Sequence, residues 1–584
     1  FCTESDPDKI QMFFFLKRIY QSSKSLQVKQ CATALPEVVE ENILYLVAGK
    51  QSCSSVEVPA KGVFWILGDP IGALSSPENL IKANGDIDLH TLYTELAGHY
   101  NWFWVGRDQL ATGSSFGGIL PVYYHHEINC VCISSSSDFL ADRIHAPAND
   151  RRYIIERLLF HYPLFDATWY QEIKLLPAHS QLSITATHFS VRKNLDFSAY
   201  SGTPSKSHNR DLNQLAEQFV SACSDFMPVN RFGISLTGGF DGRTLVGVAL
   251  KNNRSFFTYS FGAACSSDIQ VPARQAKKLG LSHHSIILDE NYLKNDADRS
   301  IQDFMSLSDY HGNVGRPHYL YSASILSQET SFIITGNFGS ELFRALHLPG
   351  MMMTKHLIDV FSSSDRQWKD RLWTEVKSWG QNDFDAELEG LIDDINKYLD
   401  ESGMTGNARF YRFVYEELFR KYFGPEIIMQ NHFLNNRTPY LNYSFVHSLN
   451  QTIWSGVHRP LFEENKFKRM IGQLFYAQVL RMSDHRLYRM KTSKGYAPND
   501  VGESWRKPVL FYRYIQQKFN QNEALDDNNV FSVIEHFMQE SKLNGIPDSG
   551  ITFKGLNRDT LINWLSIAYG ITKRNANHYA STTY

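Results

Sequence analysis

The sequence predicts two kinds of structure in succession, of the α+β and α/β classes. The first part is rich in antiparallel β-strands, and the second has a parallel sheet, covering helices and a helical C-terminal part. Three observations predict this. Short apolar runs, separated by turn residues, recur between residues 10 and 135. Strand and helix patterns alternate between residues 212 and 334. Residues 355–580 have mostly helical spacing of apolar residues.

The size of the chain predicts at least two domains. It has 584 residues, which is more than one hydrophobic core usually serves. Segment 197–211 is rich in Ser, Gly, Pro and Asn and is predicted to be a linker. We therefore expect one domain over residues 1–200 and a second over residues 208–584.

Composition excludes several classes of protein. The formal net charge is −3, so no global basic field attracts nucleic acid and none is expected as a partner, although local basic patches stay open. No apolar run reaches the roughly 18 residues that span a bilayer. The acidic start, Phe1 to Asp6, lacks the basic region of a signal peptide.

The seven cysteines are scattered and odd in number, which fits a reducing, cytoplasmic setting. Cys130 and Cys132 lie on one face of a predicted strand and could together bind a metal. We favour two small core residues as the interpretation of this pair.

The strand-like segments of the first part alternate with turns, and one helix interrupts them. The expected strands lie around residues 12–16, 42–47, 62–67, 100–105 and 128–133, the helix covers residues 151–160, and a further strand pair follows around residues 181–191.

In the second part, each apolar strand is followed by a segment of helical spacing. Helices are expected at 212–226, 243–252, 273–279 and 322–328, and strands at 232–236, 255–261, 283–288 and 331–334. This alternation is typical of a parallel sheet with helices on its faces.

The segment Ser235 to Thr244, Ser-Leu-Thr-Gly-Gly-Phe-Asp-Gly-Arg-Thr, joins the first of these strands to its helix. The first N–H groups of a helix have no partners and favour an anion. Gly238 and Gly239 let the backbone approach a polyphosphate, and Ser235 and Thr237 add hydroxyl donors.

Asp241 would repel phosphate by itself, so its expected role is to hold Mg²⁺ against the phosphates. The alternative is an ordinary glycine turn with a capping aspartate. Ligands bind at the carboxyl ends of parallel strands, and this position favours the nucleotide interpretation. The segment lacks the signatures of P-loops and of nicotinamide-binding folds.

The segment Thr237 to Gly242 resembles the S-G-G-x-D-S loop of the ATP-pyrophosphatases, in the asparagine-synthetase branch. Further segments resemble that family in the same order. They are Ile173–His179 (I-x-x-L-x-P-G-H), Ser255–Gly262 (the strand lining the adenine pocket), Gly336–Phe343 (G-x-G-x-D-E-L-F), Arg437–Asn442 (R-x-P-[FL]-L-D) and Arg489–Lys491 (R-x-K).

The resemblance implies a glutaminase-like domain of the Ntn type followed by an ATP-pyrophosphatase domain that uses ATP and Mg²⁺. By the same resemblance, Lys491, Asp241 and Glu341 are the catalytic residues, and Asp241 and Glu341 also bind the metal. The nucleotide-binding residues would be Ser235, Leu236, Thr237, Gly238, Gly239, Asp241, Gly242, Phe261 and Gly336.

The chain departs from the family at three places. The family's glutaminase uses an N-terminal cysteine, whereas Cys2 follows Phe1, so we expect a degenerate glutaminase, as in β-lactam synthetases and lasso-peptide cyclases. Gly242 stands where the loop usually has Ser, which removes one phosphate contact. In the second loop either Ser340 or Glu341 aligns with the metal aspartate; we prefer Glu341, because Mg²⁺ needs a carboxylate oxygen.

The expected reaction is ATP-dependent amide-bond formation through an acyl-adenylate, with AMP and pyrophosphate released, as in natural-product biosynthesis. The expected substrate is a small molecule or peptide with a carboxylate and an amine, and a homo-oligomer or a pathway partner stays open. A glutamine-dependent asparagine synthetase and a non-catalytic scaffold are the alternatives. One of Glu416 and Glu417 could assist deprotonation of the amine, but a solvated helix face is favoured for both. Arg243 either touches phosphate or lies on the surface.

Overall fold

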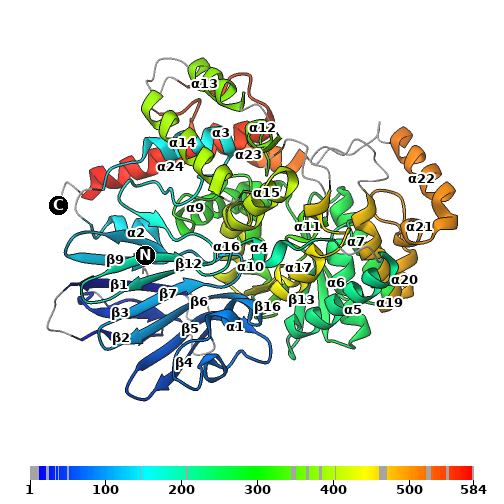
Figure 1. Ribbon diagram of the computed structural model, residues 1–584. Helices are drawn as coiled ribbons and strands as arrows, with labels where there is room; N and C mark the ends of the chain where they lie inside the picture. Colours follow the sequence, from blue (N-terminus) through cyan, green and yellow to red (C-terminus); the bar gives the residue numbers. More distant parts are fainter. Residues whose placement is uncertain are drawn as a thin grey trace.

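The computed structural model describes residues 12–20, 25–32, 34–36, 38–48, 52–144, 147–204, 208–343, 350, 352–362, 367–379, 384–401, 403–459, 470–520, 528–547 and 551–581. Figure 1 shows β-sheets from the first part of the chain on one side and helices of the second part around a smaller sheet. No helix among the described residues is both long and apolar enough to cross a lipid bilayer.

Two six-stranded sheets come from the first 193 residues and pack face to face. All their neighbouring strands are antiparallel except β2 and β3, which are parallel. Phe14 of one sheet and Phe103 of the other meet with ring centroids 4.9 Å apart. The first sheet contains β10 (Lys174–Leu175), β8 (Tyr123–His126), β9 (Cys130–Ser134), β1 (Phe13–Ile19), β3 (Ile43–Val47) and β2 (Gln27–Cys31). The second contains β12 (Phe189–Lys193), β11 (Ser180–Ile184), β7 (Leu110–Ser114), β6 (Ala97–Gly106), β5 (Gly62–Ile71) and β4 (Cys53–Val58).

The third sheet is entirely parallel, as the alternating pattern predicted. Its order is β15-β14-β13-β16-β17, so the chain starts in the middle, adds two strands on one side and then two on the other. The strands are β13 (Phe232–Ser235), β14 (Phe256–Gly262), β15 (His283–Ile287), β16 (Phe332–Ile334) and β17 (Asn435–Arg437).

Helices surround the sheets and make up most of the chain after β16. Those up to this strand are α1 (Leu89–Thr94), α2 (Ser137–Ala141), α3 (Arg151–Phe160), α4 (Ser198–Ser201), α5 (His208–Phe226), α6 (Asp241–Lys251), α7 (Ser267–Leu279), α8 (Glu290–Asn295), α9 (Ala297–Leu307) and α10 (His318–Leu326). The later ones are α11 (Gly339–Phe343), α12 (Lys355–Ser362), α13 (Trp368–Ser378), α14 (Asp385–Glu401), α15 (Gly406–Phe413), the π-helix η3 (Val414–Phe423), α16 (Gly424–Asn431), α17 (Tyr443–Asn450), α19 (Gln473–Ser483), α20 (His485–Arg489), α21 (Pro498–Gly502), the 3₁₀ turn η7 (Ser504–Arg506), α22 (Lys507–Asn520), α23 (Asn528–Ser541) and α24 (Arg558–Ser581).

The Ser- and Gly-rich segment 197–211 differs from the expected linker, because α4 and the first turn of α5 lie within it. Tyr200 of α4 is fully buried, and its carbonyl accepts a hydrogen bond from Asn450 at 2.9 Å. The segment is therefore packed onto the second part of the chain. The proposed domain boundaries stay a prediction.

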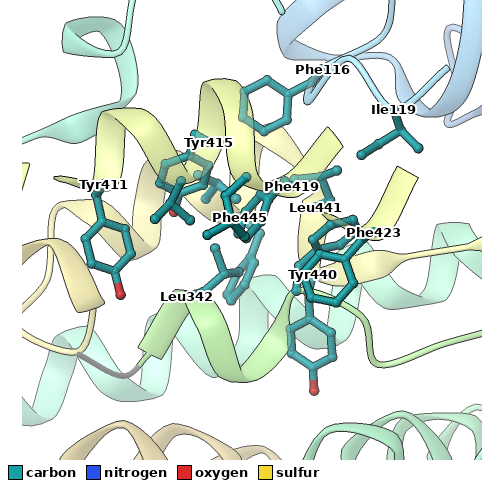
Figure 2. Packing of buried hydrophobic residues seen from close by; sticks show 14 of the residues in the cluster. Phe116, Ile119, Leu342, Tyr411, Tyr415, Phe419, Phe423, Tyr440, Leu441 and Phe445 are labelled. Carbon is teal, nitrogen blue, oxygen red and sulfur yellow. The ribbon is translucent and has the colours of Figure 1, made fainter. Parts of the chain in front are cut away.

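An aromatic side chain at every fourth position marks α15 and η3. Figure 2 shows Tyr411, Tyr415, Phe419 and Phe423 on these helices, close to Leu342, Tyr440 and Phe445. A π-helix has i→i+5 hydrogen bonds and therefore more than four residues per turn, so a spacing of four keeps these rings on one side. This stripe belongs to the largest buried cluster, which joins side chains of the second sheet to those of the parallel sheet.

A bidentate ion pair connects the second sheet to the parallel sheet. Arg437 of β17 donates from Nε to Asp69 Oδ2 at 2.6 Å and from Nη2 to Oδ1 at 2.8 Å. The two side chains are 13% and 17% exposed, so water screens the pair little. Asp69 lies in β5, 368 positions earlier in the chain.

A cavity of about 180 Å³ lies where the first sheet meets α16 and η3. Asp309, in its wall, is buried and accepts hydrogen bonds from Ser136 Oγ at 2.8 Å and from the Ser137 backbone N–H at 2.6 Å. Burial, with a smaller contribution from the charge of Asp138, raises the pKa of Asp309 to about 7 from its ordinary value of 3.8.

Replacing Asp69 with alanine is expected to lower the free energy of unfolding by about 2 kcal/mol, because Arg437 loses a two-point, poorly solvated partner. Urea denaturation of wild type, Asp69→Ala, Arg437→Ala and the double variant measures the coupling. Asp303→Ala is the control, since its pair with Arg299 is long and exposed. Additive effects of the two single substitutions would contradict a direct pair.

The raised pKa of Asp309 predicts a stability that falls with rising pH. The folded protein holds this proton more tightly than the unfolded chain, so stability is lost between about pH 4 and pH 7. Asn tolerates the left-handed backbone at this position, where φ is +49°. Asp309→Asn should therefore flatten the curve of melting temperature against pH, whereas the exposed Asp303→Asn should not. Parallel curves for all three proteins would refute the assignment.

Candidate nucleotide site

Two glycine-containing loops meet at the middle of the parallel sheet. β13 and β16 are neighbours, and the chain leaves them toward opposite sides of the sheet, which makes their carboxyl ends the topological switch point. The loop after β13 leads into α6, and the loop after β16 leads into α11. Ligands of open parallel sheets bind at this point.

The loop after β13 contains the predicted phosphate-binding residues. The N–H of Gly238 donates to Asp268 Oδ1 at 3.3 Å, and that of Gly239 donates to Thr237 Oγ1 at 3.3 Å. Both distances are at the long end of the normal range. The carbonyl of Gly238 accepts from the Ser493 N–H at 2.9 Å, which attaches the loop to the segment of Lys491.

Gly242 is required for packing. A Cβ at this position would lie 2.1 Å from the carbonyl oxygen of Ser235, and this oxygen belongs to the backbone of β13. A serine, which the related loop usually has there, would collide in the same way. Gly242 therefore allows α6 to pack closely against β13. It also removes the serine hydroxyl of the related loop, as expected.

Asp241 is enclosed by the second glycine loop and by two tyrosines. A Cβ on Gly339 would lie 2.5 Å from Asp241 Oδ1, and one on Gly336 would lie 2.7 Å from Asp241 Cβ. The Tyr476 hydroxyl donates to Oδ1 of Asp241, and the Tyr440 hydroxyl donates to its backbone oxygen at 3.1 Å. The Asp241 carboxylate is thus fixed beside Gly336 and Gly339.

Glu341 lies near the same tyrosine. It is buried at 7% exposure, and its Oε1 accepts from the Ser340 hydroxyl at 3.0 Å. Burial raises the pKa of Tyr476 well above its ordinary value, and the negative charges of Asp241 and Glu341 raise it further. The Tyr476 hydroxyl therefore bonds to one of the two predicted carboxylates, Asp241, and is influenced by the charge of the other, Glu341.

Of the two tyrosines that bond to Asp241, only Tyr440 belongs to a sequence motif. Tyr440 lies within the Arg437–Asn442 motif, so its neighbourhood was expected to matter. Tyr476 lies in α19, an apolar helix without any motif, and only the tertiary structure places it on Asp241. Across the described ranges, no group of three or more His, Cys, Asp and Glu side chains is arranged to hold a metal ion.

Both interpretations of Arg243, a phosphate contact and a surface position, were wrong. It is neither on the surface nor directed at the loop, because its side chain is fully buried. Its guanidinium donates to the carbonyl oxygen of Met490 at 2.5 Å and to that of Lys491 at 3.0 Å. Burial lowers the pKa of Arg243 to about 9, so it remains a cation near neutral pH.

The position of Lys491 depends on these backbone contacts. Gln275 of α7 also donates to its carbonyl, at 3.1 Å, while the lysine itself is exposed. At the end of β14, Phe261 is partly buried, and its ring centroid lies 5.0 Å from that of His318 and 5.2 Å from that of Tyr319.

Glu416 and Glu417 are not on a solvated face, so that expectation was wrong. Both are buried within the π-helix. Glu416 pairs with Lys193 at 2.6 Å and with Arg412 at 3.2 Å. Glu417 pairs with Arg420 at 2.8 Å and with Lys421 at 3.3 Å. Sequence spacing did not reveal that η3 is covered on every side.

The parallel sheet and its paired glycine loops define an α/β fold with a candidate ligand site at the carboxyl ends of its strands. Residues 215–471 match the family described as asparagine synthase. This match confirms the predicted resemblance over these residues and supports ATP-dependent chemistry of the amide-forming or amidotransferase type. This range includes Asp241 and Glu341 and ends before Lys491.

Three solved structures give weaker likenesses. Glutamine phosphoribosylpyrophosphate amidotransferase from B. subtilis, complexed with ADP and GMP, is 10% identical over 40% of this chain and 47% of its own, with a TM-score of 0.17. This chain therefore spans about half the length of that protein. NMN synthetase from Francisella tularensis is 16% identical over 36% of this chain and 93% of its own, with a TM-score of 0.19. A predicted subunit of tRNA methyltransferase from Methanocaldococcus jannaschii is 16% identical over 32% of this chain and 92% of its own, with a TM-score of 0.14. No curated protein matches the chain.

The contact between Gly242 and Ser235 predicts a steric difference between two glycines of one loop. Gly242→Ala should lower the free energy of unfolding by about 2 kcal/mol, because the new methyl group meets backbone that cannot move aside. Gly239→Ala is the matched control, since its nearest neighbour would be Thr237 Oγ1 at 3.4 Å. Equal stability of the two variants in urea denaturation would contradict the close packing of α6 on β13.

Proposed function

We propose that the protein forms amide bonds at the expense of ATP through an acyl-adenylate. A substrate carboxylate oxygen attacks the α-phosphorus, the bond from this phosphorus to the bridging oxygen breaks, and pyrophosphate leaves. An amine nitrogen then attacks the acyl carbon, loses a proton, and AMP leaves with the former carboxylate oxygen. The observation that carries the proposal is the enclosure of the Asp241 carboxylate by Gly336, Gly339 and Tyr476 beside the loop after β13.

The nucleotide would lie across the carboxyl ends of β13, β14 and β16. The N–H groups of Gly238 and Gly239 make only long hydrogen bonds within the protein, so phosphate oxygens can compete for them. Ser235, Leu236, Thr237 and Gly242 complete the loop, and the N-terminus of α6 favours an anion. Phe261 would contact the adenine, and Gly336 provides close approach beside Asp241.

Asp241 and Glu341 fit the binding of Mg²⁺. Carboxylate oxygens are hard donors, and Mg²⁺ is usually held by one or two carboxylates together with substrate phosphates and water. The two side chains meet this requirement without a third protein ligand. Bound there, Mg²⁺ would neutralise the charge of the departing pyrophosphate. Tyr476 would hold the Asp241 carboxylate in the orientation that this task needs.

Lys491 would stabilise negative charge on the pyrophosphate and on the oxyanion of the acyl carbon. Its side chain is exposed, while its backbone is fixed by the hydrogen bonds from Arg243 and Gln275. A fixed backbone with an exposed side chain suits a lysine that contacts the substrate or pyrophosphate once these occupy the site.

A degenerate glutaminase-like domain over residues 1–200 is part of the proposal. Cys2, the departure that motivates it, lies outside the described residues. The nitrogen would then come from an amine of the substrate or from ammonia. Residues 208–584 would form the ligase domain.

The proposal predicts that pyrophosphate release from ATP, with pooled carboxylic acids and amines, needs both carboxylates. Asp241→Asn should reduce release by about a hundredfold or more, and Glu341→Gln should raise the half-saturating Mg²⁺ concentration by about tenfold, because each removes a charged ligand. Ser340→Ala tests the alternative alignment and should leave the Mg²⁺ requirement nearly unchanged.

A shift of the Mg²⁺ requirement in Ser340→Ala but not in Glu341→Gln would reverse the metal assignment. Absence of nucleotide binding to the wild-type protein, measured by calorimetry with millimolar ATP and Mg²⁺, would exclude the enzyme and leave a scaffold that has kept the fold.

A further inference from the structure

A local concentration of positive charge lies next to the predicted site. Residues 473–520 contain nine Lys and Arg but only three Asp and Glu, a net charge of +6. Because the whole chain carries −3, the remaining residues carry −9. The segment from Ser504 to Asn520 has no acidic residue at all. Positive charge is therefore concentrated in the helices α19 to α22 and the loops between them.

Three exposed aromatic residues lie within this basic segment. Trp505 is 71% exposed, Phe511 is 52% exposed and Tyr512 is 66% exposed. Tyr512 follows Trp505 by about two helical turns. A single exposed ring is ordinary, but three close together in the sequence are typical of an interaction surface. We call these three residues, with Arg506, Lys507 and Arg513, the α22 surface.

Buried charge holds the α22 surface in place. Asp500 of α21 has a fully buried side chain, and its Oδ1 accepts from Arg506 Nε at 2.9 Å. Its Oδ2 accepts from Arg513 and from the backbone N–H of Ala497, the latter at 2.9 Å. α22 thus extends from a fixed base on α21, at the right-hand edge of the molecule in Figure 1.

The same helical unit leads directly to the predicted nucleotide site. The loop between α20 and α21 contains Lys491, and its Ser493 N–H donates to the Gly238 carbonyl at 2.9 Å. α21 separates that loop from the α22 surface along the chain. α21 packs against both α22 and α19, and α19 contains Tyr476 of the predicted site, so the α22 surface and the site belong to one packed unit.

We propose that the α22 surface docks an acidic peptide segment that also carries apolar side chains, and that this segment is part of the substrate. The inference rests on the proposed function, whose reaction consumes a carboxylate. Lys507 attracts the acidic residues, helped by the single net positive charge that Arg506 and Arg513 keep beside Asp500, and the exposed rings bury the apolar ones. A nucleic acid fits less well, because the surrounding protein carries net negative charge that repels a long phosphate backbone.

Fluorescence anisotropy with a labelled peptide of repeating Glu-Phe-Asp-Ala tests the proposal. The full-length protein should bind it more tightly at low salt than at physiological salt, because exposed charges are screened beyond about 8 Å at about 0.15 M. The combined variant Trp505→Ser, Phe511→Ser and Tyr512→Ser should bind about tenfold more weakly or worse. Lys507→Glu should weaken binding and reduce its salt dependence.

Matched controls are available on other surfaces. Ile128→Ser and Val229→Ser remove hydrophobic side chains that are 93% and 89% exposed, and they should leave peptide binding unchanged. Because all of these positions are exposed, the melting temperatures of the variants should equal that of the wild type, which keeps a binding loss from being mistaken for unfolding.

Several outcomes would overturn the proposal. They are absence of peptide binding, equal binding of a neutral Gln-Phe-Asn-Ala peptide, and preferential binding of a single-stranded oligonucleotide or of phosphatidylserine vesicles. The assay needs no ATP, and Asp241→Asn should bind the peptide normally. Pyrophosphate release without peptide binding would therefore refute only the docking surface, whereas peptide binding without pyrophosphate release would refute only the proposed function.

Discussion

The candidate site depends on the Asp241 carboxylate, which is enclosed by the backbone of two glycines. Gly336 and Gly339 bring the loop after β16 into contact with it, Tyr476 donates to it, and Tyr440 donates to the backbone oxygen of the same residue. A partly buried carboxylate is costly unless it is hydrogen-bonded. The requirement couples β13, β16 and α19, because a shift of any of them would separate the carboxylate from a partner.

A buried cation extends this coupling to residues far along the chain. Arg243 lies one turn of α6 away from the loop, and its guanidinium satisfies the carbonyl oxygens of Met490 and Lys491. Ser493 then closes onto Gly238. Three segments, after β13, after β16 and after α20, thereby form one wall. A charged group that is fully withdrawn from water must be bonded in this way, so the loop of Lys491 cannot move independently of α6.

An ion pair and hydrogen bonds from cationic side chains also join the first part of the chain to the second. Arg437 binds Asp69, and Arg420 and Lys421 of the π-helix donate to the carbonyl of Phe165 at 2.9 and 2.7 Å. Such pairs add less stability than apolar contacts of the same size, but they fix one arrangement of the partners. The β-sheets of the first part therefore support the helices beside the site, whatever chemistry this part itself retains.

The sequence by itself determined the class of the sheets apart from the parallel pair β2 and β3, the positions of most strands, the two glycine loops, and the positions of α3, α5, α6, α7 and α10. These follow from local patterns: apolar periodicity, turn residues, and glycine where backbones approach closely. The structure alone decided that Arg243 turns inward, that Glu416 and Glu417 are buried in ion pairs, and that Tyr476 meets Asp241. The physical reason is that burial and pairing depend on elements hundreds of residues away, so no local pattern distinguishes a solvated charge from one that a neighbouring helix will cover.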